Sequence, residues 1–268
     1  MSLRAIAALV RAGWLTAISY RVRFTFSLLS IVITIVPLYF VSRALQPLMA
    51  PVIATEGVHY FAFVTLGMFA VSVVGSALTA LPDAISTDLK SGFFEAVAST
   101  PTGPGAVAVG LSGYSIMRNT LRGAILVMAG AVLGINLAWE RLPEALVIVL
   151  LIVLAHFGIS LVAGAFVIAF RTNVAIPQMA LLASGLLGGV YYPTAVIPSW
   201  IERVSEVVPL AYGLRALRHT LLDGQGFDLV LSDVLVLLTF AIVLLATGAM
   251  AYRVSLGYAR QAGSLSQY

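Results

Sequence analysis

The chain has 268 residues, of which 60% are hydrophobic and 10% are charged, and its formal net charge is +4. Average soluble domains carry about 25% charged residues, so this composition excludes an ordinary soluble domain and indicates an integral membrane protein. The small, scattered net charge argues against a nucleic-acid-binding surface. The absence of cysteine excludes disulfides, thiolate chemistry and Cys-ligated metals.

The first segment, residues 1–22, predicts a helix that lies in the inner membrane interface. Apolar residues recur there at helical spacing, while Arg4 and Arg11 lie seven residues apart on another face. This pattern places Trp14 among the headgroups and the two arginines toward anionic membrane lipid. A basic flank that only fixes the topology is the alternative. No continuous apolar core leads to a small-residue cleavage site, so we do not expect a cleaved signal peptide.

Six stretches are apolar and long enough to cross a bilayer core, which takes roughly 20 helical residues. They lie between Arg23 and Arg43, Glu56 and Asp83, Arg122 and Glu140, Glu144 and Arg171, Arg171 and Glu202, and Asp233 and Arg253. The third helix is expected to begin earlier than its charge boundary, near Ala106. Arg118 and Arg122 are then expected at its cytoplasmic end, where they anchor the helix or meet anionic headgroups.

The distribution of basic residues predicts the orientation. A cytoplasmic N-terminus gives ten Arg and Lys residues inside and five outside. The positive-inside rule therefore predicts a multi-pass protein with both termini in the cytoplasm. The expected fold class is an all-α membrane protein with six transmembrane helices in a single domain, residues 1–268.

The inner loop after the second span predicts a short amphipathic helix over residues 86–100. Apolar side chains recur at spacings of four residues, charged ones lie on other faces, and a run of proline and glycine ends the helix. The helix either packs on the inner leaflet or presents a contact surface to a soluble partner. The residues expected at that contact are Leu89, Lys90, Phe93, Phe94 and Glu95.

The outer loop after the fifth span predicts a helical hairpin over residues 193–222 that dips into the outer leaflet. The uncharged stretch before it is longer than one helix needs, so a span from about Val174 to Tyr192 leaves residues over. Prolines end that span and begin a turn. Two short amphipathic helices follow. The second carries four leucines on one side and Arg215, Arg218 and His219 on the other.

Irregular backbone at that depth is tolerated only under cover of protein or beside a water-filled cavity. The hairpin is therefore expected to cap a transport path. The candidate gate residues are Tyr191, Tyr192, Pro193, Pro198 and Pro209. For the two tyrosines, an aromatic belt at the membrane interface is the alternative.

At these two loops the chain resembles ABC-2 type permeases of ABC exporters. The resemblance rests on LKSGFFEAVASTP and GGVYYPTAVIPSWIERVSEVVPLAYGLRALRHTLLDG, and it extends over essentially the whole chain. It implies a pathway formed by two permease copies or by a permease and a paralogue. Each is bound to a cytoplasmic ABC ATPase subunit, two copies in all, which binds ATP and Mg; no cofactor is implied in this chain. It also implies that residues 86–100 are the ATPase-coupling helix, that the N-terminal helix touches the ATPase, and that the outer hairpin is re-entrant.

The sequence itself contains no P-loop. That motif ends a glycine-rich turn with Gly-Lys-Ser/Thr, because backbone amides and the lysine together hold phosphate. The only lysine, Lys90, follows Leu89. ATP-driven transport by this chain therefore requires a second polypeptide.

Two other function classes fit less well. An ion-coupled secondary transporter usually needs intramembrane carboxylates, and only His156 lies mid-span, where we expect a packing role rather than a proton relay. An intramembrane enzyme would need clustered ligands or nucleophiles, and the three histidines are far apart in sequence. We therefore expect no catalytic or metal site. The predicted function is ATP-driven export of hydrophobic or amphipathic cargo such as a drug-like molecule or lipid, with lipid-linked polysaccharide as the alternative cargo.

Overall fold

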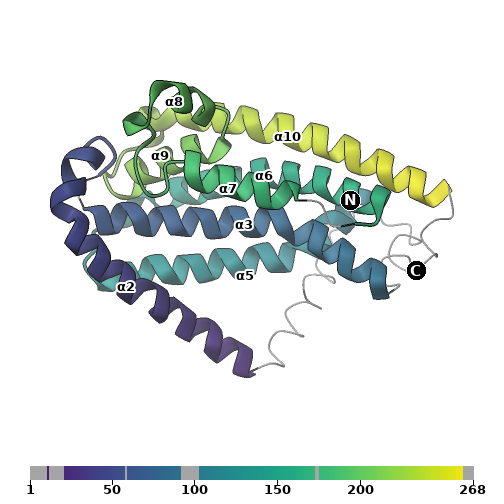
Figure 1. Cartoon of the computed structure of the whole chain (residues 1–268), viewed down its shortest axis with the longest axis horizontal. Helices are drawn as coiled ribbons and strands as arrows, with labels where there is room; N and C mark the ends of the chain where they lie inside the picture. Colours follow the sequence, from purple (N-terminus) through teal and green to yellow (C-terminus); the bar gives the residue numbers. More distant parts are fainter. Residues whose placement is uncertain (1–10, 12–20, 58, 92–102, 173–174, 262–268) are drawn as a thin grey trace.

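The computed structural model describes residues 11, 21–57, 59–91, 103–172 and 175–261. These residues form an elongated helical bundle in which the long helices run along a common axis and α2 diverges from the rest (Figure 1). The helices are α2 Arg21–Ile53, α3 Tyr60–Ser91, α5 Pro104–Val132, α6 Leu142–Phe170, α7 Ile176–Leu187, α8 Ser199–Ser205, α9 Pro209–Leu221 and α10 Phe227–Gln261, with 3-10 turns at Trp139–Arg141 and Thr194–Val196.

Within the described ranges, four helices are long and apolar enough to cross a membrane. Their apolar segments are Leu29–Ile53, Tyr60–Lys90, Trp139–Phe170 and Phe227–Ala259. The remaining two predicted spans differ from these four. Helix α5 has 29 residues, but arginine, asparagine, serine and glycine interrupt its middle. Helix α7 has only 12 residues, about 18 Å at 1.5 Å per residue.

The short length of α7 has a local cause. The predicted span extended to Tyr192, whereas the helix ends at Leu187. Gly189 follows with φ +76°, in the left-handed region that glycine adopts readily and that commonly ends helices. The chain then turns over α3, where Gly67 leaves room for the carbonyl of Val190.

Helices α6 and α10 form the most closely packed pair. Gly158 of α6 and Gly248 of α10 face each other, and a Cβ at either position would overlap backbone atoms of the other helix. Small residues let membrane helices approach at backbone distance. Helix α3 packs on the other side of α6, where the buried Ser160 donates a hydrogen bond to the Leu78 carbonyl at 2.9 Å.

The two ends of the bundle differ in what they carry. At one end, which we call the hairpin end, α9 packs on α3 and α10, and α8 packs on α7 (Figure 1). At the other end, which we call the Ser91 end, α3, α6 and α10 share an apolar cluster of buried residues that includes Ile85, Leu89 and Tyr252.

Helix α2 is the least enclosed of the four membrane-length helices, and α10 is the next least enclosed. Its apolar side chains Val32, Ile33 and Phe40 are exposed, whereas most of the apolar segment of α3 is buried. It contacts mainly α3, and α5 to a lesser extent. The line along which α2 faces α3 and α5, here called the α2 seam, is therefore the most open junction between long helices.

Candidate functional site

A fully buried ion pair holds the hairpin end together. The Arg218 guanidinium of α9 donates to the Glu56 carboxylate at 2.8 Å, and the side chains of both residues are almost completely inaccessible. The same guanidinium donates to the backbone carbonyls of Phe63 at 3.1 Å and Val190 at 3.2 Å. It also lies 3.3 Å from the centre of the Phe63 ring. One side chain thus joins α9 to α3, to the α2–α3 connection and to the segment after α7.

Arg218 stays charged in this setting. Burial lowers its pKa to about 10, and the nearby Glu56 carboxylate acts in the opposite direction. A pKa of about 10 still leaves the guanidinium protonated at neutral pH. The charge is compensated by one carboxylate, two carbonyl dipoles and an aromatic face, the kinds of partner that a buried cation requires.

Further polar contacts fix the hairpin on the bundle. The Tyr60 hydroxyl at the start of α3 donates to the Tyr191 carbonyl at 3.1 Å. On the outer side of α9, Arg215 forms two hydrogen bonds with Asp233 of α10 at 2.9 and 2.5 Å. The Arg215–Asp233 pair is partly exposed, in contrast to the buried pair of Arg218.

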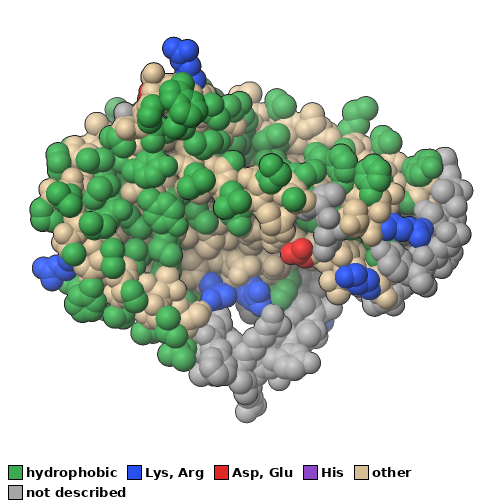
Figure 2. Space-filling model, in the orientation of Figure 1, with side chains coloured by type: hydrophobic (Ala, Val, Ile, Leu, Met, Phe, Trp, Pro, Cys, Tyr) green, Lys and Arg blue, Asp and Glu red, His purple; other side chains and the backbone are tan. Residues whose placement is uncertain are grey.

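Two cavities open along the α2 seam. The larger, about 500 Å³, lies at the hairpin end and is called the end cavity; its polar lining residues are Tyr39, Ser42, Arg43, Gln46 and His59. The smaller, about 220 Å³, lies farther along the same helices and is called the mid-helix groove; its lining residues are Ser30, Ile31, Thr34, Met68, Ser72, Asn119, Arg122, Gly123 and Leu126. Figure 2 shows basic side chains at a hollow where α2 diverges from α5, on a largely hydrophobic face.

An apolar cluster separates the two cavities. Ile31 and Leu126 belong both to this cluster and to the groove lining, while Phe61 and Ile135 belong both to the cluster and to the end-cavity lining. Along its length the seam therefore presents a groove of mixed polar and apolar lining, an apolar cluster and a second cavity of mixed lining. Such an arrangement is suited to an amphipathic ligand rather than to a hydrated ion.

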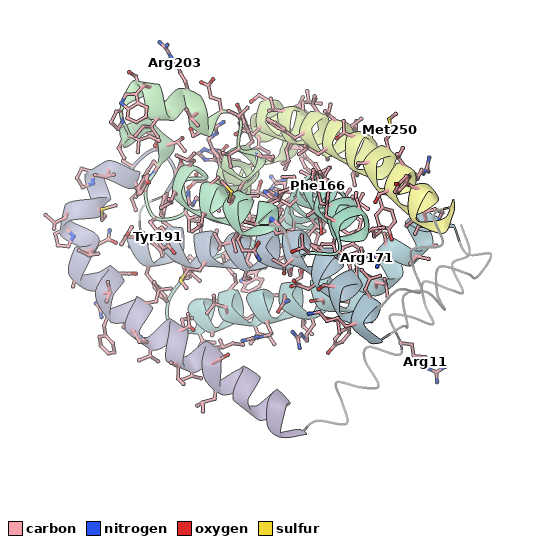
Figure 3. All side chains as sticks on the ribbon, turned by 45° about the vertical axis from the view of Figure 1, so that its right-hand side comes forward. Arg11, Phe166, Arg171, Tyr191, Arg203 and Met250 are labelled. Carbon is pink, nitrogen blue, oxygen red and sulfur yellow. The ribbon has the colours of Figure 1, made fainter. Side chains whose placement is uncertain are left out.

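The predicted gate residues all lie at the hairpin end. Tyr191 is 47% exposed and lies beside the start of α3, just after the end of α7 (Figure 3). The Tyr192 hydroxyl donates to the Leu186 carbonyl at 2.8 Å. Pro193 and Pro198 immediately precede the Thr194–Val196 turn and α8, and buried Pro209 is the first residue of α9. Two short helices thus flank Pro209, as the amphipathic pattern predicts.

The predicted docking and interfacial residues fall largely outside the described residues. Residues 86–91 form the last turns of α3 rather than a separate helix; Leu89 is buried in the cluster at the Ser91 end and Lys90 is exposed. Arg11 is exposed (Figure 3). The structure does not describe Phe93, Phe94, Glu95, Arg4 or Trp14.

Two sequence-based placements of arginines are wrong. Arg218 was expected on the polar side of its helix, but it is fully buried. It follows Leu210 and Leu214 at spacings of eight and four residues, so the apolar stripe itself gives its position. Arg118 and Arg122 were expected at a helix end. Because α5 begins at Pro104 and ends at Val132, Arg118 is its central residue and Arg122 lies one turn nearer the hairpin end.

His156 is fully buried in the middle of α6. Its Nδ1 lies 2.8 Å from the Ile152 carbonyl oxygen, and its Nε2 lies 3.5 Å from Ser184 of α7. No carboxylate among the described residues forms an ion pair with it. These neighbours are those of a polar group that joins two packed helices.

Comparison with known proteins places these features in a family. The ABC-2 type transporter family matches residues 4–222. Nodulation protein J of Sinorhizobium fredii (strain NBRC 101917 / NGR234) is 23% identical over 172 residues, 64% of this chain and 65% of the relative. The linearmycin resistance permease protein LnrN of Bacillus subtilis (strain 168) is 26% identical over 131 residues, 49% of this chain and 34% of the relative.

A nodulation protein J from Rhizobium leguminosarum bv. viciae is 26% identical over 195 residues, 70% of this chain and 72% of that protein. The chain thus spans just under two thirds of the length of the Sinorhizobium relative and about a third of LnrN. The family match covers most of this chain, including the α2 seam and the hairpin. The chain therefore belongs to the ABC-2 type transporter family.

Proposed function

We propose that this chain is the permease subunit of an ATP-driven exporter of amphipathic cargo in the plasma membrane. The family match over residues 4–222 carries the proposal. The sequence has no P-loop, so ATP and Mg are bound by a separate ABC ATPase, present in two copies. A second permease copy or a paralogue completes the pathway.

In the proposed layout α5 and α7 join the four apolar helices to make six spans, and both termini are cytoplasmic. The length of α5 supports its inclusion, since 29 residues extend about 43 Å. Without mid-helix Arg118 and Arg122 and buried Arg218, the count of basic residues is eight to four, which still favours a cytoplasmic Ser91 end and an outer hairpin end. Helix α8 is then an outer interfacial element, and its exposed Trp200 and Val204 suit a headgroup region.

The cytoplasmic ATPase would dock on residues 86–100. Supporting this, α3 ends at Ser91, at the end of the bundle opposite the hairpin. Leu89 ties this segment to the buried cluster of α6 and α10. A push on the docking segment would therefore reach the membrane helices through α3, which packs along both α5 and α6.

The cargo is proposed to be a hydrophobic or amphipathic molecule such as a drug-like compound or a lipid. Two cavities of mixed polar and apolar lining lie along the α2 seam with the apolar cluster between them, and this arrangement supports an amphipathic cargo. One relative is named as a linearmycin resistance permease, which also favours a small-molecule cargo.

The test uses the chain co-expressed with the ABC ATPase of a neighbouring reading frame. We expect the ATPase to co-purify and the pair to hydrolyse ATP. The triple variant F93A/F94A/E95A should retain less than about a tenth of the ATPase, which corresponds to a loss of about 1.4 kcal/mol or more. The matched variant W200A/R203A/V204A, on exposed α8 positions at the other end, should retain it fully. Transport by the purified chain alone, without ATP, would contradict the proposal.

The layout has its own test, because the chain has no native cysteine. Single Arg203→Cys and Lys90→Cys variants each place one thiol on an exposed position at opposite ends of the bundle. A membrane-impermeant maleimide applied to intact cells should label only the Arg203→Cys variant. Labelling of the Lys90→Cys variant from outside would reverse the topology.

A further inference from the structure

Helix α5 carries two cations at a depth where a bilayer offers them nothing to pair with: Arg122, which lines the mid-helix groove, and Arg118, one turn away. Arg118 is the central residue of the 29-residue helix α5, so about 21 Å of helix lies on either side of it. Arg122 is about 15 Å from Val132 at the end of the same helix. Its neighbour across the groove, Ser72, is about 18 Å along α3 from Tyr60. Both helices thus put the groove near the membrane centre.

The described structure provides no counter-charge for this pair. None of its four ion pairs includes Arg118 or Arg122. Arg122 donates one hydrogen bond, from Nη2 to the Ser30 hydroxyl of α2 at 2.6 Å. The Nε of Arg118 is buried without a hydrogen-bond partner among the described residues, and its guanidinium lies 5.7 Å from the centre of the Tyr114 ring. Ionisable residues inside a membrane usually mark a functional path.

The two arginines act on one face of α5, because a spacing of four residues aligns their side chains. Around Arg122 the groove adds hydroxyl and amide groups from three helices: Thr34 on α2, Ser72 on α3 and Asn119 on α5. The Thr34 and Ser72 hydroxyls donate to carbonyls of their own helices, so the anion-binding donors are those of the guanidinium. A guanidinium binds oxyanions such as phosphate, sulfate and carboxylate with short charge-assisted hydrogen bonds. The chemistry of the groove is therefore that of an anion site.

The surroundings of the groove show what kind of anion can reach it. Its remaining lining is apolar, with Ile31, Met68 and Leu126. On the adjoining surface of α5, Leu121 and Ile125 are exposed. A free inorganic ion would have to cross hydrocarbon to reach this depth, whereas an amphiphile already has its acyl chain in the bilayer. Its tail could then lie against these apolar side chains.

We propose that the mid-helix groove is the subsite that binds the anionic headgroup of an acyl-chain amphiphile drawn laterally from the bilayer as export cargo. This rests on the proposed function and narrows its cargo class to anionic amphiphiles. Arg122 supplies the charge inside the groove, and Arg118 adds a second charge one turn away on α5. The hydroxyl of Ser30 is the group that the headgroup replaces on Arg122. The apolar cluster that contains Ile31 and Leu126 then contacts the acyl chain of the amphiphile.

The test places a fluorophore in the groove. A Thr34→Cys variant of the cysteine-free chain carries one thiol, on a groove-lining position of α2, and is labelled with bimane. The labelled chain in phosphatidylcholine nanodiscs is titrated with phosphatidic acid or phosphatidylcholine, each with a 5-doxyl quencher on its acyl chain. We expect half-quenching at a mole fraction about tenfold lower for phosphatidic acid, a preference typical of charge-assisted hydrogen bonds.

Three charge variants identify the source of that preference. R118Q/R122Q should bring the two lipids to the same half-quenching fraction. R118K/R122K keeps both charges and should keep most of the preference, which separates lost charge from a misfolded helix. R203Q/R253Q removes the same number of charges from exposed positions on α8 and α10 and should leave the preference unchanged.

Several outcomes would overturn the assignment. One is equal quenching by the two lipids in the otherwise wild-type chain, and another is an equal loss of preference in R203Q/R253Q. Displacement of the labelled lipid by millimolar inorganic phosphate would mark a site for free anions. Phosphatidic acid that stays bound after exchange into excess phosphatidylcholine would mark a resident structural lipid. The purified chain is measured without ATP or ATPase, so failure here leaves ATP-driven export to be judged by co-purification alone.

Discussion

Replacing Glu56 by glutamine is expected to destabilise the hairpin end strongly while keeping its shape. The amide is nearly isosteric, and it can still accept a hydrogen bond from Arg218. The guanidinium, however, loses its only anionic partner among the described residues. Removing one member of a buried pair costs about 3–5 kcal/mol. The Phe63 and Val190 carbonyls and the Phe63 ring remain, so we expect the low end, about 3 kcal/mol.

The measurement is thermal unfolding of the purified chain in detergent, followed by tryptophan fluorescence. At roughly 2–4 °C per kcal/mol for a chain of this size, E56Q should lower the midpoint by about 6–12 °C. The double variant E56Q/R218M removes both charges and should melt above E56Q, because a buried pair replaced by uncharged groups often costs little. Asp233→Asn breaks the partly exposed pair with Arg215 and should cost less than about 1 kcal/mol.

The reasoning would be refuted if E56Q and D233N shifted the midpoint by the same small amount. It would also be refuted if E56Q/R218M melted at or below E56Q. In either case the Glu56 charge would contribute nothing to holding Arg218, and the hairpin would be held by its apolar contacts alone.

Three further changes test other junctions. Gly248→Val should prevent close packing of α6 and α10 and lower the melting midpoint by more than about 6 °C, whereas Gly257→Ala on the same helix, where a Cβ meets no atom, should leave it unchanged. Tyr60→Phe removes the hydrogen bond to the Tyr191 carbonyl and should speed hydrogen exchange after α7, with unchanged exchange as the contradicting result. Ser160→Ala removes the hydrogen bond to the Leu78 carbonyl of α3, which should cost about 1 kcal/mol and lower the melting midpoint by about 2–4 °C. A decrease above about 10 °C would exclude the loss of a single hydrogen bond as the cause.

The helical character of the chain and its long apolar helices could be predicted, because hydrocarbon imposes a simple length rule on uncharged runs. The third helix was expected to start near Ala106, and α5 starts at Pro104. Residues around Pro209 also behave as their sequence indicates: proline cannot continue a helix but is well accommodated in the first turn of a new one.

The depth of charged residues could not be predicted in the same way. The arginines were predicted by one rule, that each lies at the end of a span or on the polar face of an amphipathic helix. Arg118 breaks that rule because glycines at 123 and 130 let α5 pack closely along α3, so the helix extends past its charged middle. Arg218 breaks it because its counter-charge, Glu56, is 162 residues away in sequence. Long-range pairing of this kind leaves no local pattern.

The glycine contact between α6 and α10 determines where this bundle can widen. At Gly158 and Gly248 the two backbones are so close that neither helix can slide or roll without passing through the other. Helices α6 and α10 are therefore expected to move together as one rigid unit. An increase in internal volume is therefore expected from an outward movement of α2, which the hydrogen bond between Arg122 and Ser30 joins to α5. Helix α2 is thus the side of the bundle expected to move, and α6 and α10 are the side expected to stay fixed.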